Sequence, residues 1–263
     1  MKIFVINLKR SVERRVKIEK QLKSLGMDYE IFEGVDGYKL TEDDLNKYMD
    51  HEHKYFRELK KGEIGCFLSH YSVLKKIVDL ELPSAIVMED DIILSKNFPT
   101  LVIEIEKFIQ PSDTFLFYTI LLQPVNLFTK KKINDKYTLT DVDNIRSLFG
   151  MQCYAVGSET AKQISSHLLP VNNVVDDWLR YVENGYTKNL QIIFPFPIKA
   201  TPAFSDIHDT DISNTRFAWF KTLIRKHKIF PFWQIIMYKR KKWSEHGTEL
   251  ISVDGKQVPS KFL

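Results

Sequence analysis

Short runs of branched apolar residues alternate with amphipathic stretches over the first 200 residues of the chain, and this alternation predicts strands separated by helices. The run KIFVINL predicts a first strand, and Ser11 then predicts the cap of a helix that ends at Gly26. Apolar residues recur at helical spacing inside this helix, at Val12, Val16, Ile18, Leu22 and Leu25. EIFEGVDG follows as a second strand with a turn between Gly34 and Gly37. This opening predicts a parallel strand–helix–strand unit with a right-handed crossover and a binding site at the carboxyl ends of its strands.

The same alternation continues through residue 200. It predicts strands at residues 85–94, 113–121, 151–158 and 191–200, the last broken by prolines, and helices at residues 61–80, 99–110, 158–169 and 174–185. The lysine-rich stretch 128–140 predicts a hairpin or an exposed loop, and the Asp-rich stretch 201–214 predicts a polar loop. Strands alternating with helices predict an open α/β sheet, and the sequence shows no internal repeat and no flexible linker.

Composition narrows the class of protein. The 263 residues are 44% hydrophobic, which is enough for one large α/β domain or two small ones, so we expect a soluble, enzyme-sized unit. The first apolar run reaches Lys9 and Arg10 too soon for a signal peptide, and no apolar stretch is as long as a membrane span. Cys66 and Cys153 are too few for a disulfide scaffold, and we expect buried thiols in a reducing cytoplasm.

Three consecutive carboxylates, Glu89, Asp90 and Asp91, interrupt the apolar run AIVMEDDIIL at residues 85–94. A buried strand leaves no water at its end to solvate such charges. Because side chains alternate along an extended chain, we expect Glu89 and Asp91 on one face and Asp90 on the other. Two converging carboxylates could hold a hard divalent cation, and a polar loop that leaves the strand is the alternative.

Four segments together resemble glycosyltransferase family 25, in its bacterial lipooligosaccharide galactosyltransferase type. They are FVINLKRSVERR at the amino terminus, EIFEGVDG near residue 34, GEIGCFLSH ending at residue 70, and IVMEDDIIL at residues 86–94. The resemblance covers about the first 100 residues well and continues through GMQCYAVGS and VVDDWL to about residue 180. It implies a GT-A-type fold, that is, an open, mostly parallel sheet flanked by helices, over residues 1–211.

The same resemblance implies an activity. It is the inverting transfer of galactose from UDP-galactose to a saccharide acceptor in lipooligosaccharide or lipopolysaccharide biosynthesis. Two alternatives stay open: the same fold using UDP-glucose or a UDP-N-acetylhexosamine, and a non-catalytic nucleotide-binding or membrane-binding module.

A divalent metal, Mn²⁺ or Mg²⁺, is also implied, at the place where such enzymes carry a DxD motif. Glu89 and Asp91 occupy this place, with Glu89 replacing the first Asp, and Asp90 could bind a sugar hydroxyl instead. His208 is the implied third ligand, with neighbouring aspartates of its loop as competitors: Asp206, Asp209 and Asp211. A bound cation acts as a Lewis acid on a diphosphate leaving group.

The first strand and the VDG turn are implied to flank the donor nucleotide. The candidate contacts to uridine and phosphates are Asn7, Arg10, Arg15 and Asp36. An arginine can hold a phosphate through two parallel hydrogen bonds, whereas solvated helix residues are the alternative for Arg14 and Arg15. The resemblance places His70 near the donor, where it would position the ligand; a helix histidine with ordinary hydrogen bonds is the alternative.

Inverting transfer needs a base that removes the proton of the acceptor hydroxyl. Asp176 and Asp177 in VVDDWL match the place of a base near a helix start, and the resemblance favours Asp177. A helix amino-terminal cap is the alternative reading of the same two carboxylates.

Residues 212–263 form a predicted basic, aromatic-rich helical extension packed on the same domain. Its stretch 216–243 contains nine Lys and Arg and eight aromatic residues, without Asp or Glu. This mixture predicts peripheral contact with anionic lipid on the inner face of the bacterial inner membrane, where a lipid-linked oligosaccharide acceptor would lie. Nucleic acid is a rival partner that we disfavour, and a helix packing its aromatics inward is a third possibility.

Overall fold

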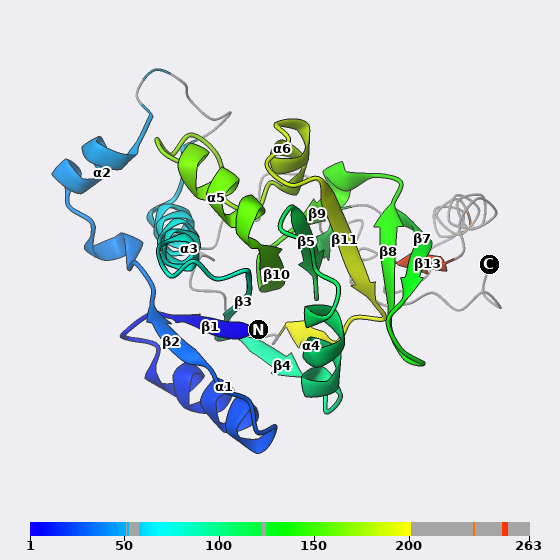
Figure 1. Cartoon of the computed structure of the whole chain (residues 1–263). Helices are drawn as coiled ribbons and strands as arrows, with labels where there is room; N and C mark the ends of the chain where they lie inside the picture. The colour runs from blue at the N-terminus through cyan, green and yellow to red at the C-terminus, as the bar shows by residue number, and fades with distance from the viewer. Residues whose placement is uncertain (51, 53–57, 123–124, 201–233, 235–248, 252–263) are drawn as a thin grey trace.

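The protein is an α/β fold built around one large sheet (Figure 1). The structure, a computed structural model, describes residues 1–50, 52, 58–122, 125–200, 234 and 249–251. In this part of the chain the large sheet has nine strands, in the order β13-β7-β8-β11-β5-β10-β3-β1-β2. Two short pairs, β4 with β12 and β6 with β9, lie outside it.

The elements have the following bounds. The strands of the large sheet are β1 Lys2–Asn7, β2 Glu30–Glu33, β3 Ser84–Glu89, β5 Asp113–Leu116, β7 Val125–Lys132, β8 Thr138–Val142, β10 Cys153–Gly157, β11 Asn189–Phe194 and β13 Glu249–Ile251. The short strands are β4 Ile92–Leu94, β6 Ile120–Leu121, β9 Leu148–Phe149 and β12 Ile198–Ala200. The helices are α1 Val12–Ser24, α2 Glu42–Tyr48, α3 Lys61–Asp79, α4 Phe98–Glu106, α5 Ser158–His167 and α6 Trp178–Glu183, with 3-10 turns η1 Gly37–Lys39 and η2 Ile145–Ser147.

Strand directions confirm the predicted open, mostly parallel sheet. β1 pairs in parallel with β2 and β3, and β11 pairs in parallel with β5. Followed through the antiparallel pairings, the directions of β2, β1, β3, β5, β11 and β7 agree, and β10, β8 and β13 run the other way. The predicted opening unit is therefore present, with β1 in the middle of its parallel trio.

Helices cover both faces of the sheet, and the alternation of side chains along β3 shows how. Ala85 and Val87 pack in one core with residues of α3, α5 and α6, whereas Ile86 and Met88 pack in a second core with residues of α1 and α4. Figure 1 shows these two helical layers on opposite sides of the strands. Because both faces are covered here, the central strands β1, β3 and β10 are buried along almost their whole length, whereas β7 and β2 toward the edges carry polar residues.

Several elements differ from the sequence prediction, among them the predicted strand 113–121, which is β5 and the separate short strand β6. The apolar run 85–94 is not one strand, because the chain turns at Asp90 and Asp91 and β4 leaves to pair with β12. In α1, Ile18 and Leu22 are buried, but Val12 and Val16 are exposed. At about 100° per residue, Val12 and Val16 lie more than 100° around the helix from Ile18, so one face could not bury all of them.

Other expectations have mixed outcomes. The lysine-rich stretch 128–140 is a hairpin of β7 and β8, and 191–200 breaks at its prolines into β11 and β12. The loop 201–214 lies outside the described residues, as does the extension 212–263 apart from Gln234 and β13, so the boundary at residue 211 stays a prediction. Within the described ranges, every helix is too short or too polar to cross a bilayer.

Candidate functional site

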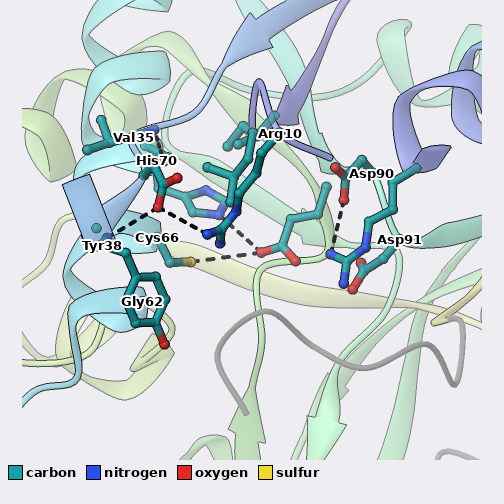
Figure 2. Close-up of a pocket in the computed structure, with 15 residues that line it drawn as sticks. Arg10, Val35, Tyr38, Gly62, Cys66, His70, Asp90 and Asp91 are labelled. Atoms are coloured by element: carbon teal, nitrogen blue, oxygen red, sulfur yellow. Dashed lines mark hydrogen bonds and ion pairs between the residues drawn. The ribbon is translucent and has the colours of Figure 1, made fainter. Parts of the chain in front are cut away.

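An open cleft lies at the carboxyl ends of β1 and β3, where parallel strands of an α/β sheet form binding sites (Figure 2). Its walls come from β1, the start of α1, the VDG turn, α3 and the end of β3. The lining residues are Ile6, Leu8, Arg10, Arg14, Val35, Asp36, Gly37, Tyr38, Gly62, Cys66, Ser69, His70, Glu89, Asp90 and Asp91. All three carboxylates of the EDD motif thus reach one cleft.

The end of β3 sends Glu89 and Asp90 to different partners, as strand alternation predicts. Glu89 turns toward α3, where its Oε1 lies 3.4 Å from His70 Nε2 and 4.0 Å from Cys66 Sγ. Asp90 turns toward α1: its Oδ2 accepts a hydrogen bond from Asn7 Nδ2 at 2.6 Å, and its Oδ1 lies 3.6 Å from Arg14 Nη1. Asp90 therefore ties β1, β3 and α1 together at the floor of the cleft.

Asp91 is the most perturbed carboxylate of the cleft. Burial, together with the negative charges of Glu89 and Asp90, raises the pKa of Asp91 to about 7, although the positive charge of Arg14 lowers it. The three carboxylates therefore carry more negative charge than Arg14 neutralises. A hard divalent cation prefers such a set of carboxylate oxygens, so Asp91 and Glu89 fit the metal that the family implies.

The VDG turn lies directly against α3 because two glycines allow it. A Cβ built on Gly37 would stand 1.7 Å from the Lys61 carbonyl oxygen, and one on Gly65 would stand 2.6 Å from the Val35 carbonyl oxygen. Ser69 completes the contact by accepting from Val35 N at 2.8 Å and donating to Gly65 O at 2.6 Å. The two motifs that sequence analysis treated separately are one packed unit.

This packing presents Asp36 and Tyr38 to the cleft. Asp36 caps η1 by accepting from Tyr38 N at 3.2 Å, and its Oδ1 lies 3.5 Å from Arg10 Nη1. The Arg10 guanidinium also lies 5.5 Å from the centre of the Tyr38 ring. Figure 2 shows Arg10 and Tyr38 on the same side of the cleft, where a flat ring and a phosphate could both be bound.

In α1 the structure places a different arginine in the cleft from the one that was predicted. Arg14, not Arg15, lines the cleft and pairs with Asp90. Arg15 instead donates from Nε to Glu19 Oε1 at 3.0 Å, one turn along the exposed surface of α1. Adjacent helix residues point about 100° apart, so only one of the two can face the cleft.

His70 is fully buried and joins α3 to the sheet. Its Nδ1 lies 3.1 Å from the Tyr154 hydroxyl on β10, and its Nε2 faces Glu89. Cys66 stands one helical turn earlier on the same face of α3. Burial, followed by the charges of Glu89, Asp176 and Asp91, holds the pKa of the Cys66 thiol well above its usual value.

Asp176 and Asp177 have different surroundings. Asp177 caps α6, where its Oδ1 accepts from Arg180 N at 3.4 Å and its Oδ2 accepts from Asn173 Nδ2 at 3.0 Å. Asp176 Oδ2 accepts from Gly150 N at 3.0 Å. Burial raises the pKa of Asp176, and the hydrogen bond from Gly150 N works against this rise; Asp176 does not line the cleft, but the charge of Glu89 also raises its pKa.

A short stretch between β9 and β10 connects these groups. Gly150 donates to Asp176 and accepts from Trp178 Nε1 at 2.9 Å, while Gln152 O accepts from Glu89 N at 2.9 Å. Trp178 is fully buried against Tyr154 and Tyr181, so it belongs to the core. The spacing between Glu89 and Asp176 therefore depends on residues 150–152.

The sequence did not point to Tyr38 and Cys66 as groups of the cleft, and it ranked Arg14 behind Arg15 and Asp176 behind Asp177. The signal for Cys66 was its four-residue spacing from His70 on a predicted helix. The predicted third metal ligand, His208, lies outside the described residues together with its competitors Asp206, Asp209 and Asp211. The membrane segment 216–243 lies outside them too, except for Gln234.

Known proteins have sequences similar to part of this chain. The profile of the family described as glycosyltransferase family 25 (LPS biosynthesis protein) matches residues 1–179. A glycosyltransferase 25 family member of Aedes aegypti is 40% identical over 111 residues, which are 39% of this chain and 18% of that protein. Procollagen galactosyltransferase 2 of Homo sapiens is 40% identical over 104 residues, 36% of this chain and 16% of that protein.

Two further comparisons show how far the likeness extends. The glycosyltransferase R655 of Acanthamoeba polyphaga mimivirus is 36% identical over 161 residues, which are 60% of this chain and 48% of that protein. The matched part is thus about half of the viral relative, but less than a fifth of each animal relative. A solved glycosyltransferase involved in the glycosylation of the major capsid of PBCV-1 aligns with a TM-score of 0.38 and 8% identity over 73% of this chain and 79% of that one, which is too loose to support an argument. Animal and viral relatives do not single out a bacterial lipooligosaccharide type, but the match over residues 1–179 is sufficient to state that the chain belongs to glycosyltransferase family 25.

Proposed function

We propose that this protein transfers galactose from UDP-galactose to a hydroxyl of a saccharide acceptor, with inversion at the sugar carbon. The observation that carries the proposal is the cleft in which Arg10, Arg14 and the EDD carboxylates meet at the ends of β1 and β3. Family membership and the galactosyltransferase names of relatives such as the human protein support the choice of sugar.

The residues of the cleft suit the parts of a nucleotide sugar. Arg10 and Arg14 would hold the diphosphate, and Asp36 and Tyr38 would contact the nucleoside. Asn7 and Asp90 would act by holding Arg14, since both Asp90 oxygens already face Asn7 and Arg14. His70 would set the orientation of Glu89.

Asp91 and Glu89 would hold Mn²⁺ or Mg²⁺. When bound, the cation supplies Lewis-acid stabilisation of the charge that develops on the departing UDP. The protein's own arginines share that charge, while the acceptor hydroxyl attacks the sugar carbon from the opposite side and gives its proton to a carboxylate.

Two carboxylates compete for the role of base. The resemblance favours Asp177, whereas the surroundings of the two side chains in the structure favour Asp176. We expect Asp176→Asn to lower kcat by about 10²-fold or more, because the raised pKa of Asp176 suits a general base and its charge interacts with the cleft. We expect Asp177→Asn to change the free energy of unfolding little, because asparagine caps a helix about as well as aspartate, and to have a smaller effect on kcat.

Initial rates and urea unfolding of both variants decide between them. If Asp177→Asn alone removes turnover while Asp176→Asn keeps it, the base is Asp177 as the sequence predicted.

The acceptor and its place in the cell complete the proposal. A lipid-linked oligosaccharide of the growing lipooligosaccharide agrees with the description of the matching family. The basic segment 216–243 would then bind anionic lipid peripherally at the cytoplasmic face of the inner membrane, without a role for nucleic acid.

Release of UDP from a panel of UDP-sugars, with a saccharide acceptor and with Mn²⁺ or EDTA, tests the activity directly. We expect turnover with UDP-galactose to exceed that with UDP-glucose or a UDP-N-acetylhexosamine, and to be lost in EDTA. A better rate with another sugar would replace the donor and keep the family. Full activity in EDTA would remove the metal role, and absence of turnover with every donor would favour the non-catalytic binding module.

A further inference from the structure

Three side chains of different chemistry converge at the inner end of the cleft. Among the described residues, one ligand atom each of Cys66, His70 and Glu89 lie within 4.8 Å of one another. Figure 2 shows Cys66 and His70 pointing from α3 toward the same carboxylate, which belongs to Glu89. A sulfur, an imidazole nitrogen and a carboxylate oxygen form the type of ligand set that binds zinc.

The spacing fits a tetrahedral ion. Ligand atoms about 2.1 Å from Zn²⁺ are about 3.4 Å apart along a tetrahedron edge, and a sulfur–oxygen edge is about 3.6 Å. His70 Nε2 and Glu89 Oε1 are 3.4 Å apart, and Cys66 Sγ and Glu89 Oε1 are 4.0 Å apart. The ligand atoms of Cys66 and His70 lie within 4.8 Å of each other, so a movement of the thiol by up to about 1 Å would complete three corners.

The surroundings fit as well. The Tyr154 hydroxyl lies 3.1 Å from His70 Nδ1, so its oxygen can accept a hydrogen bond from a protonated Nδ1. In that tautomer Nε2 carries no proton and is free to bind a metal. Asp91 and Asp176 add negative charge close to Cys66. This charge disfavours a thiolate without a metal, but it favours a dication.

We propose that Cys66, His70 and Glu89 form a zinc-binding site at the inner end of the cleft, with a fourth position open to the cleft. This site is distinct from the hard-cation site at Asp91, although the two share Glu89. Binding of Zn²⁺ releases the Cys66 thiol proton to solvent. The proposal does not depend on the sugar transferred or on any turnover.

Cobalt provides a probe that reports on sulfur. When Co²⁺ is added to the full-length, metal-free protein, we expect a thiolate-to-cobalt charge-transfer absorption. The band should disappear in Cys66→Ala and persist in Cys153→Ala, because Cys153 packs in the core on the opposite face of the sheet. Absence of the band in the parent at saturating Co²⁺, or its persistence in Cys66→Ala, would overturn the proposal.

Competition between the protein and a chromophoric chelator for Zn²⁺ tests the histidine. We expect His70→Gln to weaken Zn²⁺ binding at least tenfold and to diminish the cobalt band. His167→Gln is the matched control, since His167 is exposed on α5 and bonded to the Gln163 carbonyl, and it should change neither. Equal zinc affinity and an equal band in His70→Gln and the parent would contradict the three-ligand site.

Discussion

Replacement of Asp91 by Asn is expected to remove most of the activity and to stabilise the fold at the same time. Asp91 stands with Glu89 and Asp90 in one cleft, and the proposed function assigns it the metal. Loss of a carboxylate ligand should lower kcat/KM with UDP-galactose and Mn²⁺ by at least about 10²-fold, comparable with the loss of a charge-stabilising group in an active site. Initial rates at saturating Mn²⁺ measure this effect.

The gain in stability follows from the pKa of Asp91. The ordinary pKa of an aspartate is 3.8, and the pKa of Asp91 in the folded protein is about 7. Between about pH 4 and pH 7 the folded state therefore keeps a proton on Asp91 that the unfolded state has already lost. Stability therefore falls as pH rises through this window. The difference of about three units corresponds to about 4 kcal/mol, and because Glu89 and Asp90 share the repulsion we expect Asp91→Asn to recover about 2 kcal/mol at pH 8.

Urea unfolding in EDTA at pH 4 and pH 8 tests this expectation. The advantage of Asp91→Asn over the parent should be small at pH 4 and largest at pH 8. Asp79→Asn is the matched control, because Asp79 is exposed and pairs with Lys75 one turn earlier in α3, a contact worth about 0.5 kcal/mol or less. An unchanged difference between Asp91→Asn and the parent across the pH range would contradict the charge repulsion described for the cleft.

The second large effect is expected from Gly37→Ala. An alanine Cβ would stand 1.7 Å from the Lys61 carbonyl oxygen, and neither group is the end of a flexible side chain. The VDG turn would have to move off α3, so we expect a loss of more than about 3 kcal/mol in the free energy of unfolding. Affinity for UDP should also fall at least tenfold, because Asp36 and Tyr38 move with the turn.

Gly26→Ala provides the comparison. Gly26 has φ of +65°, and a Cβ there meets nothing within 4 Å, so only the backbone preference is lost, about 1–2 kcal/mol. Urea unfolding and calorimetric titration with UDP should show Gly26→Ala with normal UDP affinity. A Gly37→Ala protein as stable as Gly26→Ala and binding UDP normally would mean that the turn does not need its contact with α3.

The sequence predicted those features that depend on local periodicity. The two-residue alternation of β3 placed Glu89 and Asp90 toward different partners, and the order of strands and helices predicted the α/β sheet. Periodicity could not decide which arc of α1 packs inward, because it grouped the exposed Val12 and Val16 with the buried Ile18 and Leu22. The resemblance preferred Arg15, whereas Arg14 pairs with Asp90.

Features that depend on long-range contacts were not accessible in this way. Cys66 and Glu89 are 23 residues apart, and only the packing of α3 on β3 brings them together. The difference between Asp176 and Asp177 depends on Gly150, which is 26 residues from Asp176 along the chain. A pattern of charges near a helix start gives both aspartates the same prediction, whereas the fold gives each its own partner.

The stretch 150–152 has a consequence for specificity. It holds Asp176 by the Gly150 amide and Glu89 by the Gln152 carbonyl, so under the proposed function it would act as a spacer between the metal ligand Glu89 and the base Asp176. One inserted residue adds up to about 3.3 Å of chain, whereas a misplacement of about 1 Å in an active site can cost about 10²-fold in rate. The length of this short loop would thereby select which hydroxyl of the acceptor sugar is within reach of the donor, and so the linkage that is formed.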